Sequence, residues 1–190
     1  MKIGVLGLQG DVREHVRALE AAGATPVVVK YPYEIDDVDA MVVPGGESTT
    51  IGKLLDRFGL LEPLSTRARS GMPVYGTCAG AILLARDIVG PDDAQHRIPL
   101  MDIAVRRNAY GRQIDSFETD LEVSGLSQPF RAVFIRSPVI ETTGEAVQVL
   151  AEHDGKPVLV RQGHLLASTF HPEMTGDDRV HRLFVETMGR

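Results

Sequence analysis

Apolar and polar positions alternate with two different periods along the first half of the chain. Compact runs of Val, Ile and Leu are separated by stretches in which apolar residues recur at helical spacing. The runs predict strands over residues 2–8, 26–30, 40–43 and 72–75, and the stretches predict helices over residues 12–22 and 50–58. Strands that alternate with helices form crossover units around a mainly parallel sheet. The first half therefore predicts a conventional α/β layer.

In the second half, short apolar runs follow one another with turns between them. Strands are expected over residues 103–105, 121–123, 132–135, 147–150, 157–160 and 165–170, the last two as a hairpin around Gln162 and Gly163. These strands predict a mixed sheet. A final helix over residues 177–188 carries Val180, Leu183, Phe184 and Met188 at helical spacing, which indicates a face packed on the core. We expect one domain over residues 1–190, since neither a linker nor a repeat interrupts the chain.

Composition agrees with a compact protein. The chain has 190 residues, 43% of them hydrophobic, which is enough for one core covered on two sides. The formal net charge of −6, without a run of Lys or Arg, argues against a nucleic-acid surface. The first residues are too few and too rich in glycine for a secretory signal, and no stretch approaches the roughly 20 apolar residues of a membrane span. We therefore expect a cytoplasmic protein without membrane or nucleic-acid partners.

The single cysteine, Cys78, lies where a predicted strand meets a short apolar stretch of helical character. Its neighbours are Gly76-Thr77-Cys78-Ala79-Gly80, which has the spacing of the G-x-S-x-G turn with sulfur in place of oxygen. Small residues two before and two after the nucleophile let such a turn bend sharply. A thiol at the start of a helix also meets the positive end of the helix dipole, which favours the thiolate. The turn thus predicts an exposed, activated Cys78.

A lone cysteine is more often a small buried hydrophobe than a reactive group, so a catalytic role needs a base. Six histidines are available, and five have surroundings typical of a helix surface, a polar loop or an alternating strand. These five are His15, His96, His153, His164 and His181. For each of them we expect a solvated or structural role.

His171 differs, because it follows an apolar run and precedes Pro172 and Glu173. A residue before proline is pushed toward extended backbone, and residues two apart in extended chain project to the same side. His171 and Glu173 are therefore expected to face the same way. A carboxylate that holds one imidazole nitrogen leaves the other free to take a proton from a thiol. Alone, His-Pro-Glu is equally typical of a turn that ends a strand; together with the cysteine turn it favours a triad.

Two glycine-rich loops follow predicted strands, and neither has the spacing of a nucleotide site. Residues 4–10 form G-x-x-G-x-x-G, which is not the dinucleotide fingerprint, and residues 44–50 lack the lysine of a P-loop. In the second loop, Ser48 or Thr49 is suited to cap the next helix. Sites of open α/β sheets lie at the carboxyl ends of strands, which predicts this loop beside the cysteine turn. The backbone N–H groups of Gly46 and Ala79 would then form an oxyanion hole.

These motifs carry a resemblance to a known family. The Gly-x-Cys-x-Gly turn, the upstream Pro-Gly-Gly loop and the terminal His-Pro-Glu are similar to those of the triad glutamine amidotransferases, which release ammonia from glutamine. Narrower matches run through the whole chain: Gly4 to Gly10, Val12-Arg13-Glu14-His15, Pro44 to Thr50, Gly76 to Gly80, Arg107-Asn108, Tyr110-Gly111-Arg112-Gln113, Asp115-Ser116-Phe117-Glu118, Phe134-Ile135-Arg136 and Phe170 to Glu173. Together they resemble the glutaminase subunits of pyridoxal 5'-phosphate synthase.

The resemblance implies a fold, a substrate and a partner. The fold is the class I glutamine amidotransferase type, a three-layer, flavodoxin-like α/β domain with a mixed, mainly parallel sheet and helices on both faces. The substrate is L-glutamine. Ammonia passes to a separate synthase subunit in a large hetero-oligomer, which builds pyridoxal 5'-phosphate from ribose 5-phosphate and glyceraldehyde 3-phosphate. A chain of 190 residues has no room for a second domain of synthase size. Neither a metal nor an organic cofactor is implied.

The same resemblance implies roles for individual residues. Cys78 is the nucleophile, His171 is the base and then the acid, and Glu173 orients His171. The family's glutamine contacts match Gly46, Glu47, Ser48, Arg107, Ile135 and Arg136. Without the family, the two arginines in that set would be interpreted as surface charges. Gln9 is the candidate for sensing the docked synthase.

Two positions depart from the family pattern, and two alternatives stay open. Asp11 stands where a small apolar residue is frequent, and Ser137 where alanine is common. One alternative is another enzyme of the same fold, such as the glutaminase subunit of imidazole glycerol phosphate synthase or a cysteine peptidase; Arg107-Asn108 and the Phe-Ile-Arg motif argue against both. The other is a catalytically silent regulatory subunit, against which the intact triad residues argue.

Overall fold

A central sheet of seven strands organises the molecule, which the computed structural model describes over residues 1–90, 96–107 and 116–188. Its strands are β1 (Lys2–Leu6), β2 (Thr25–Val29), β3 (Ala40–Val43), β4 (Val74–Thr77), β10 (Gln148–His153), β11 (Lys156–Gln162) and β12 (Leu165–Ser168). They lie in the order β10-β11-β12-β4-β3-β1-β2. The five strands from β12 to β2 are parallel, whereas β10 and β11 are joined by antiparallel pairing.

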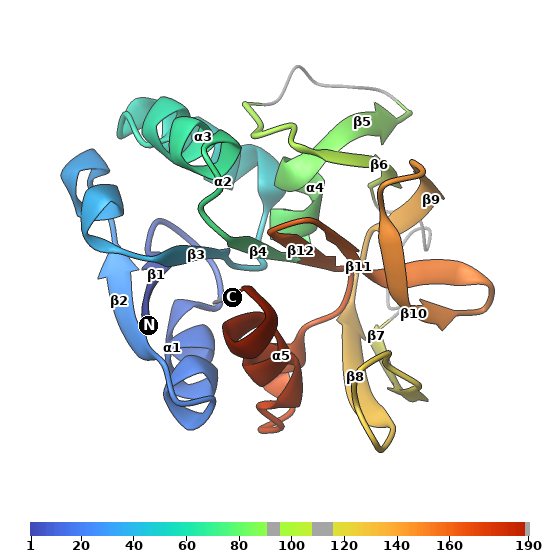
Figure 1. Cartoon of the computed structure of the whole chain (residues 1–190). Helices are drawn as coiled ribbons and strands as arrows, with labels where there is room; N and C mark the ends of the chain where they lie inside the picture. The colour runs from blue at the N-terminus through green and yellow to red at the C-terminus, as the bar shows by residue number, and fades with distance from the viewer. Residues whose placement is uncertain (91–95, 108–115, 189–190) are drawn as a thin grey trace.

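Helices cover both faces of this sheet (Figure 1). One face carries α1 (Val12–Ala21) and α5 (Arg179–Met188), and the other carries α2 (Ser48–Arg57), α3 (Leu61–Arg69) and α4 (Ala79–Leu84). Side chains of β1 alternate between the two cores: Ile3 and Val5 pack in the cluster that contains Phe184, and Leu6 packs in the cluster that contains Ile51. This arrangement confirms the expected three-layer α/β fold.

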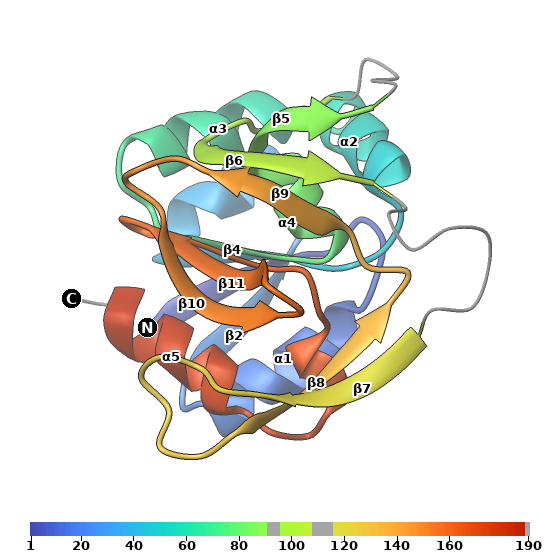
Figure 2. The ribbon, with the colours of Figure 1, turned by 90° about the vertical axis from the view of Figure 1, so that its right-hand side faces the viewer.

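Of the strands in the second half, β10, β11 and β12 join the central sheet and make it mixed, as expected, whereas the other five strands of the described chain form two small sheets. The three-stranded sheet contains β5 (Ala85–Val89), β6 (Met101–Arg106) and β9 (Val139–Thr143), and the antiparallel pair contains β7 (Ser116–Leu121) and β8 (Phe130–Ile135). Figure 2 places them on opposite sides of the central sheet. Their inward side chains explain the division, because Ile103 joins one core cluster and Phe134 joins the other.

Most expected elements are present with shifted ends, but the strand expected over residues 121–123 is wrong, because β7 ends at Leu121 and the next two residues belong to no strand. The hairpin around Gln162 and Gly163 is confirmed as the β11–β12 pair. In the last helix, Val180 and Phe184 are buried and Leu183 is half-buried. The helix α3, the strands β5 and β9 and two 3-10 turns, η1 (Pro32–Asp37) and η2 (Pro172–Met174), were not predicted from the sequence. Motif residues 108, 110–113 and 115 and the side chain of Met188 lie outside the described part of the chain.

The cap of α2 is another correction. Glu47, and not Ser48 or Thr49, occupies the N-cap position, and its carboxylate accepts from the N–H groups of Thr49 at 3.0 Å and Thr50 at 2.7 Å. Partial burial opposes ionisation, but these hydrogen bonds and one from the Thr50 hydroxyl lower the pKa of Glu47 to about 2. Glu47 is therefore ionised at neutral pH.

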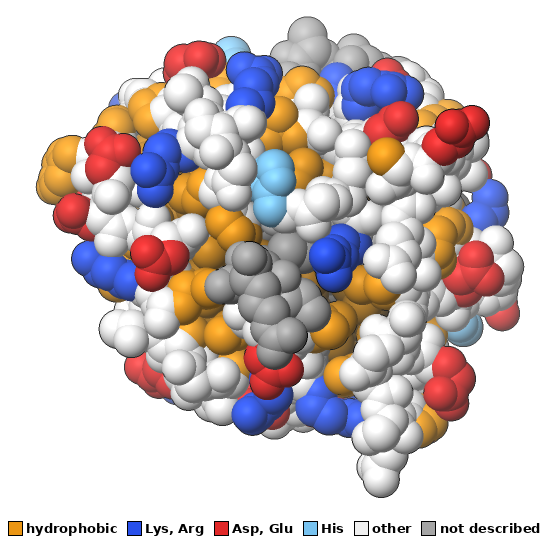
Figure 3. Space-filling view, viewed as in Figure 1, with side chains coloured by type: hydrophobic (Ala, Val, Ile, Leu, Met, Phe, Trp, Pro, Cys, Tyr) orange, Lys and Arg blue, Asp and Glu red, His pale blue; other side chains and the backbone are white. Residues whose placement is uncertain are grey.

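Charge on the surface is mixed. On the face shown in Figure 3, Lys and Arg side chains are interspersed with Asp and Glu. Among the helices that the structure describes, none combines the length and apolar character needed to cross a bilayer.

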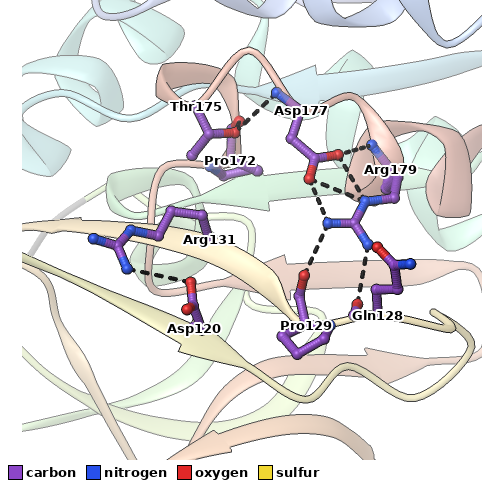
Figure 4. A network of polar contacts seen from close by, with 8 residues as sticks. All are labelled: Asp120, Gln128, Pro129, Arg131, Pro172, Thr175, Asp177 and Arg179. Carbon is purple, nitrogen blue, oxygen red and sulfur yellow. Dashed lines mark hydrogen bonds and ion pairs between the residues drawn. The ribbon is translucent and has the colours of Figure 1, made fainter.

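One arginine ties the start of α5 to the connection between β7 and β8 (Figure 4). Arg179 donates from Nε and Nη2 to the carboxylate of Asp177, at 3.0 and 2.6 Å. Its Nη1 and Nη2 also donate to the carbonyl oxygens of Gln128 and Pro129, at 3.0 and 2.9 Å. A planar guanidinium is suited to such a fork of acceptors.

The same network reaches the η2 turn. Thr175 donates from its hydroxyl to the carbonyl of Pro172 at 3.0 Å and accepts from the N–H of Asp177 at 3.1 Å. Pro172 lies between His171 and Glu173, so these bonds hold the backbone from which both side chains project.

We expect Arg179→Met to lower the free energy of unfolding by about 1–2 kcal/mol, because a carboxylate and two carbonyls lose a charged donor. Urea denaturation at neutral pH measures the change. Arg131→Met is the matched control, since Arg131 pairs with Glu118 and Asp120 on the exposed surface and should matter much less. Equal effects of the two substitutions would contradict the anchoring role of Arg179.

Candidate active site

Cys78 occupies a sharp turn between β4 and α4. Its φ of 48° lies in the left-handed region, which costs energy for a residue with a side chain. Its N–H donates to the carbonyl of Ser168 at 2.8 Å, which ties the turn to β12. The expected strand–turn–helix geometry is therefore present. The expected exposure is wrong, because only 6% of Cys78 is accessible and its side chain lines the wall of a pocket.

The pocket beside Cys78 has a volume of about 510 Å³ and gathers residues from distant parts of the chain. It is lined by Gln9, Asp11, Gly46, Glu47, Ser48, Cys78, Ala79, Ile82, Arg107, Ile135, Arg136, Pro138, His171 and Met174. Every residue proposed above for catalysis, the oxyanion hole, glutamine binding or partner sensing lines this pocket, except Glu173. The loop after β3 thus lies beside the cysteine turn, as strand order and the carboxyl-end rule predict.

Glu173 lies behind His171 and contacts it directly. Nδ1–H of His171 donates to Oε1 of Glu173 over 2.8 Å, and both side chains are almost wholly buried. The backbone N–H of His171 donates to the carbonyl of Val133 in β8 at 2.8 Å. The expectation that the two side chains face the same way is confirmed. The reason differs, because Glu173 stands in the 3-10 turn η2 and not in extended chain.

A second carboxylate also approaches His171. Oδ2 of Asp11 lies 3.4 Å from Nδ1 of His171. Burial disfavours the imidazolium, but hydrogen bonds to Asp11, Cys78 and Glu173 outweigh it and hold the pKa of His171 well above its usual value. A histidine with a raised pKa adds stability that is fully present below about pH 6.5 and is lost as pH rises through the raised value. Asp11 therefore favours a protonated His171.

The same atoms form the one cluster of metal-ligand type among the described residues. One ligand atom from each of Asp11, His171 and Glu173 lies within 4.8 Å of the others. A metal at Nδ1 would require a neutral imidazole, and the raised pKa of His171 opposes that form. The two carboxylates are therefore better suited to orient and stabilise a protonated His171 than to bind a metal ion.

The loop that carries Gly46 is held by Gln9. Oε1 of Gln9 accepts from the N–H of Glu47 at 3.0 Å. Gly46 has a φ of 149°, and a Cβ built there would lie 2.6 Å from Oε1 of Gln9. Gln9 is thus in direct contact with the peptide that the sequence analysis assigned to the oxyanion hole.

The two arginines of the pocket differ in environment. The side chain of Arg107 is 19% exposed, donates to the hydroxyl of Thr49 at 3.2 Å and lies 3.8 Å from Glu47. Without the family it would have been interpreted as a surface charge, which is wrong for Arg107. Arg136 is exposed and has a φ of 45°, so its backbone is strained at the rim of the pocket. The next residue, Ser137, is buried, and its hydroxyl has no partner among the described atoms.

Two histidines that were not predicted at the site lie beside the triad. His15 and His181 are wholly buried, so of the solvated or structural role expected for them the structural one holds. Nε2 of His15 lies 3.5 Å from Oε2 of Glu173. Helical spacing could have indicated this burial, because His15 lies four residues before Leu19 and His181 lies three before Phe184. Residues at these spacings share one face of a helix, and both Leu19 and Phe184 are buried.

We expect Asp11→Asn to lower the pKa of His171, because a neutral amide stabilises the imidazolium less than a carboxylate does. Side-chain NMR titration of His171 measures this. Glu20→Gln removes a charge from the exposed surface of the same helix and should leave the titration unchanged. An unaltered His171 titration in Asp11→Asn would show that the 3.4 Å approach has no electrostatic effect.

Comparison with known proteins agrees with this geometry. The SNO glutamine amidotransferase family matches residues 5–190. Proteins called pyridoxal 5'-phosphate synthase subunit PdxT from Frankia casuarinae and Bacillus velezensis are 60% and 52% identical over 188 and 186 residues, in each case 98% of this chain and 94% of the relative. A crystal structure described as a glutamine amidotransferase covers 99% of both chains with a TM-score of 0.93 and 50% identity.

A more distant structure, PurLQS from Thermotoga maritima, covers 97% of both chains with a TM-score of 0.68 and 19% identity. At that identity it supports the fold alone. The match over nearly the whole chain and the high identities decide the assignment: this chain belongs to the SNO glutamine amidotransferase family.

Proposed function

We propose that this chain is the glutaminase subunit of a pyridoxal 5'-phosphate synthase, which hydrolyses L-glutamine and passes the ammonia to a synthase subunit. One observation carries the proposal: the only cysteine stands on a strained turn in the same pocket as His171, which is bonded to Glu173. The names of the relatives support the synthase as partner. The proposal includes a cytoplasmic location, where such a synthase would find its sugar phosphates.

In the first step, the thiolate of Cys78 attacks the side-chain amide carbon of glutamine, and the carbonyl oxygen becomes an oxyanion. Ala79 is the first residue of α4, so its N–H has no acceptor within the helix and can donate to that oxygen. The N–H of Gly46 is the proposed second donor. In a model protease, loss of one such donor raises the barrier by roughly 2.7–4 kcal/mol.

In the second step, protonated His171 gives its proton to the amide nitrogen, the C–N bond breaks and ammonia leaves. A water molecule then loses a proton to His171 and attacks the γ-glutamyl thioester. Glutamate is released and Cys78 is regenerated. Glu173 holds the imidazole through both proton transfers without exchanging protons itself.

The proposed glutamine contacts fit the charges of the pocket. The α-carboxylate of glutamine would meet the guanidinium groups of Arg107 and Arg136. Glu47 is ionised, since its pKa is lowered to about 2, and would meet the α-ammonium group. Gly46, Ser48 and Ile135 complete the proposed site from the remaining wall.

A gate at the Gly46 peptide is part of the proposal. Ammonia released into solvent would be wasted, so weak activity alone and higher activity with the docked synthase are expected. Gln9 accepts from the N–H of Glu47 and would transmit docking to the adjacent peptide. Substitution of Gly46 is a poor test, because a Cβ would collide with Gln9.

Cys78→Ala should fold normally and lose glutamine hydrolysis by at least about a thousandfold, because the nucleophile is removed while the apolar wall is kept. Ammonia and glutamate release are measured with the synthase subunit present. Ser65→Ala, which removes a buried hydroxyl from α3, should keep wild-type turnover. Full activity in Cys78→Ala would refute the mechanism, and an inactive wild type would favour a silent regulatory subunit.

Glutamine hydrolysis by the wild type should rise to saturation as the synthase subunit is added, and Gln9→Ala should respond weakly because the link to Glu47 is lost. Steady-state ammonia release against synthase concentration measures both. Gln148→Ala, an exposed glutamine in β10, is the matched control. A wild type that is maximally active alone would contradict partner gating.

A further inference from the structure

The carboxylate of Glu173 has two oxygens, and His171 accounts for only one. Oε1 accepts from His171 at 2.8 Å, whereas Oε2 is buried without a hydrogen bond of ordinary length among the described residues. A buried carboxylate oxygen is stable only where donors replace the water it has lost. Nε2 of His15 lies 3.5 Å from Oε2, and both side chains have no exposed surface.

His15 is held on both sides by buried polar groups. Its Nδ1 lies 2.9 Å from Nε2 of His181 in α5, and its Nε2 lies 3.0 Å from the hydroxyl of Thr77 in β4. The ring of Tyr75 packs edge-on against His181, with centroids 6.0 Å apart. The imidazole of His15 therefore has one fixed place between α5, β4 and η2.

Both of these histidines are neutral at physiological pH. Burial, followed by the nearby His181 and His171, lowers the pKa of His15 well below its usual value. Burial also lowers the pKa of His181 to about 4, although Asp178 acts in the opposite direction. A neutral imidazole carries one N–H and one lone pair, so each ring has a definite tautomer.

The partners of the two rings decide the tautomer. If His15 carried its hydrogen on Nδ1, the lone pair on its Nε2 would face the Glu173 carboxylate. His181 would then keep a buried N–H at Nδ1 without a partner. If His181 instead donates from Nε2, the Nε2–H of His15 points at two acceptors, the Thr77 hydroxyl and Oε2 of Glu173. Shared hydrogens of this kind are common, and a carboxylate can only accept.

We propose that His15 is a positioning residue of the triad: His181 fixes its tautomer, and its Nε2–H holds the outer oxygen of Glu173 so that the inner oxygen stays aligned with His171. The inference rests on the function proposed for Cys78 and His171. His15 touches neither glutamine nor the thiol, so it acts only through Glu173.

The expected effect has a definite sign. The titratable groups that face the dyad are Asp11, Cys78, Tyr75, His15 and, behind His15, His181 with Asp178. Without the donor at His15, the ionised form of Glu173 is less stable and supports the imidazolium of His171 less. The pKa of His171 should fall, and Cys78 should react more slowly with an electrophile at a given pH.

Two amides provide a matched pair of variants. His15→Gln places its amide nitrogen near the position of Nε2 and keeps a donor toward Glu173, whereas His15→Asn reaches only the position of Nδ1. Alkylation of Cys78 by iodoacetamide against pH reports the thiolate directly, since the chain has no other cysteine. His15→Asn should shift this profile to higher pH and lower kcat roughly tenfold with KM unchanged, the effect of weakening one charged hydrogen bond.

His15→Gln should restore most of the wild-type profile. His164→Asn is the control, because it removes another partly buried imidazole that has a hydrogen-bond partner, the carbonyl of Ala68 at 2.7 Å, but does not line the pocket. Equal profiles in the Asn and Gln variants, whether wild-type or impaired, would overturn the positioning role. Alkylation needs no glutamine, so a wild type that releases no ammonia would refute the proposed function without deciding this inference.

A measurement on the unaltered protein decides the case if neither variant folds. The ¹⁵N shifts of the imidazole nitrogens should show His15 as the Nε2–H tautomer and neutral at neutral pH, because burial lowers its pKa. The Nδ1–H tautomer, or a charged His15 at neutral pH, would overturn the proposal.

Discussion

The turn at Cys78 is the constraint on which the rest of the site depends. The chain leaves β4 and enters α4 within one residue, which requires the left-handed φ of 48° at Cys78. Room for so tight a turn comes from missing side chains. A Cβ at Gly76 would lie 2.6 Å from the backbone of Gly80, and a Cβ at Gly80 would overlap the carbonyl of Val43. The last of these contacts brings the end of β3, and with it the Gly46 loop, against the nucleophile.

Local patterns in the sequence were sufficient for the elements around this turn. β3 was predicted with its observed bounds, because its apolar residues form a short buried run between polar segments. β5 and β9 were missed, because Arg86 and Glu141 interrupt their apolar pattern where the small sheet meets solvent. The division of the second half into two small sheets depends on which core each strand joins. That choice is made by contacts between segments far apart in the chain.

In the site, too, contacts between residues close in sequence could be predicted, whereas contacts between distant segments could not. The spacing of His171 and Glu173 predicted that their side chains face the same way, and the 2.8 Å bond confirms this although Glu173 stands in a 3-10 turn and not in extended chain. Spacing could not place His15 and His181 in one buried chain, since 166 residues separate them and only the docking of α5 beside α1 joins them. Helical spacing marks each as inward-facing, but polar character argues for the surface. His15 and His181 can nevertheless be buried, because their rings and Glu173 provide hydrogen-bond partners for one another.

The bonded pair of His171 and Glu173 thus has buried polar neighbours on one side and the solvent-accessible pocket on the other. His15 and His181, without exposed surface, act on Glu173 from the buried side, where solvent does not screen them. Asp11, whose side chain is 27% exposed, acts on His171 from the pocket, where water and salt weaken it. Burial, with a smaller contribution from the charge of Asp11, raises the pKa of Glu173 above its usual value, although the hydrogen bond and the charge of His171 act in the opposite direction. The carboxylate of Glu173 and the imidazolium of His171 therefore stabilise each other's charge. A residue that stabilises the ionised form of Glu173, such as His15, also raises the pKa of His171.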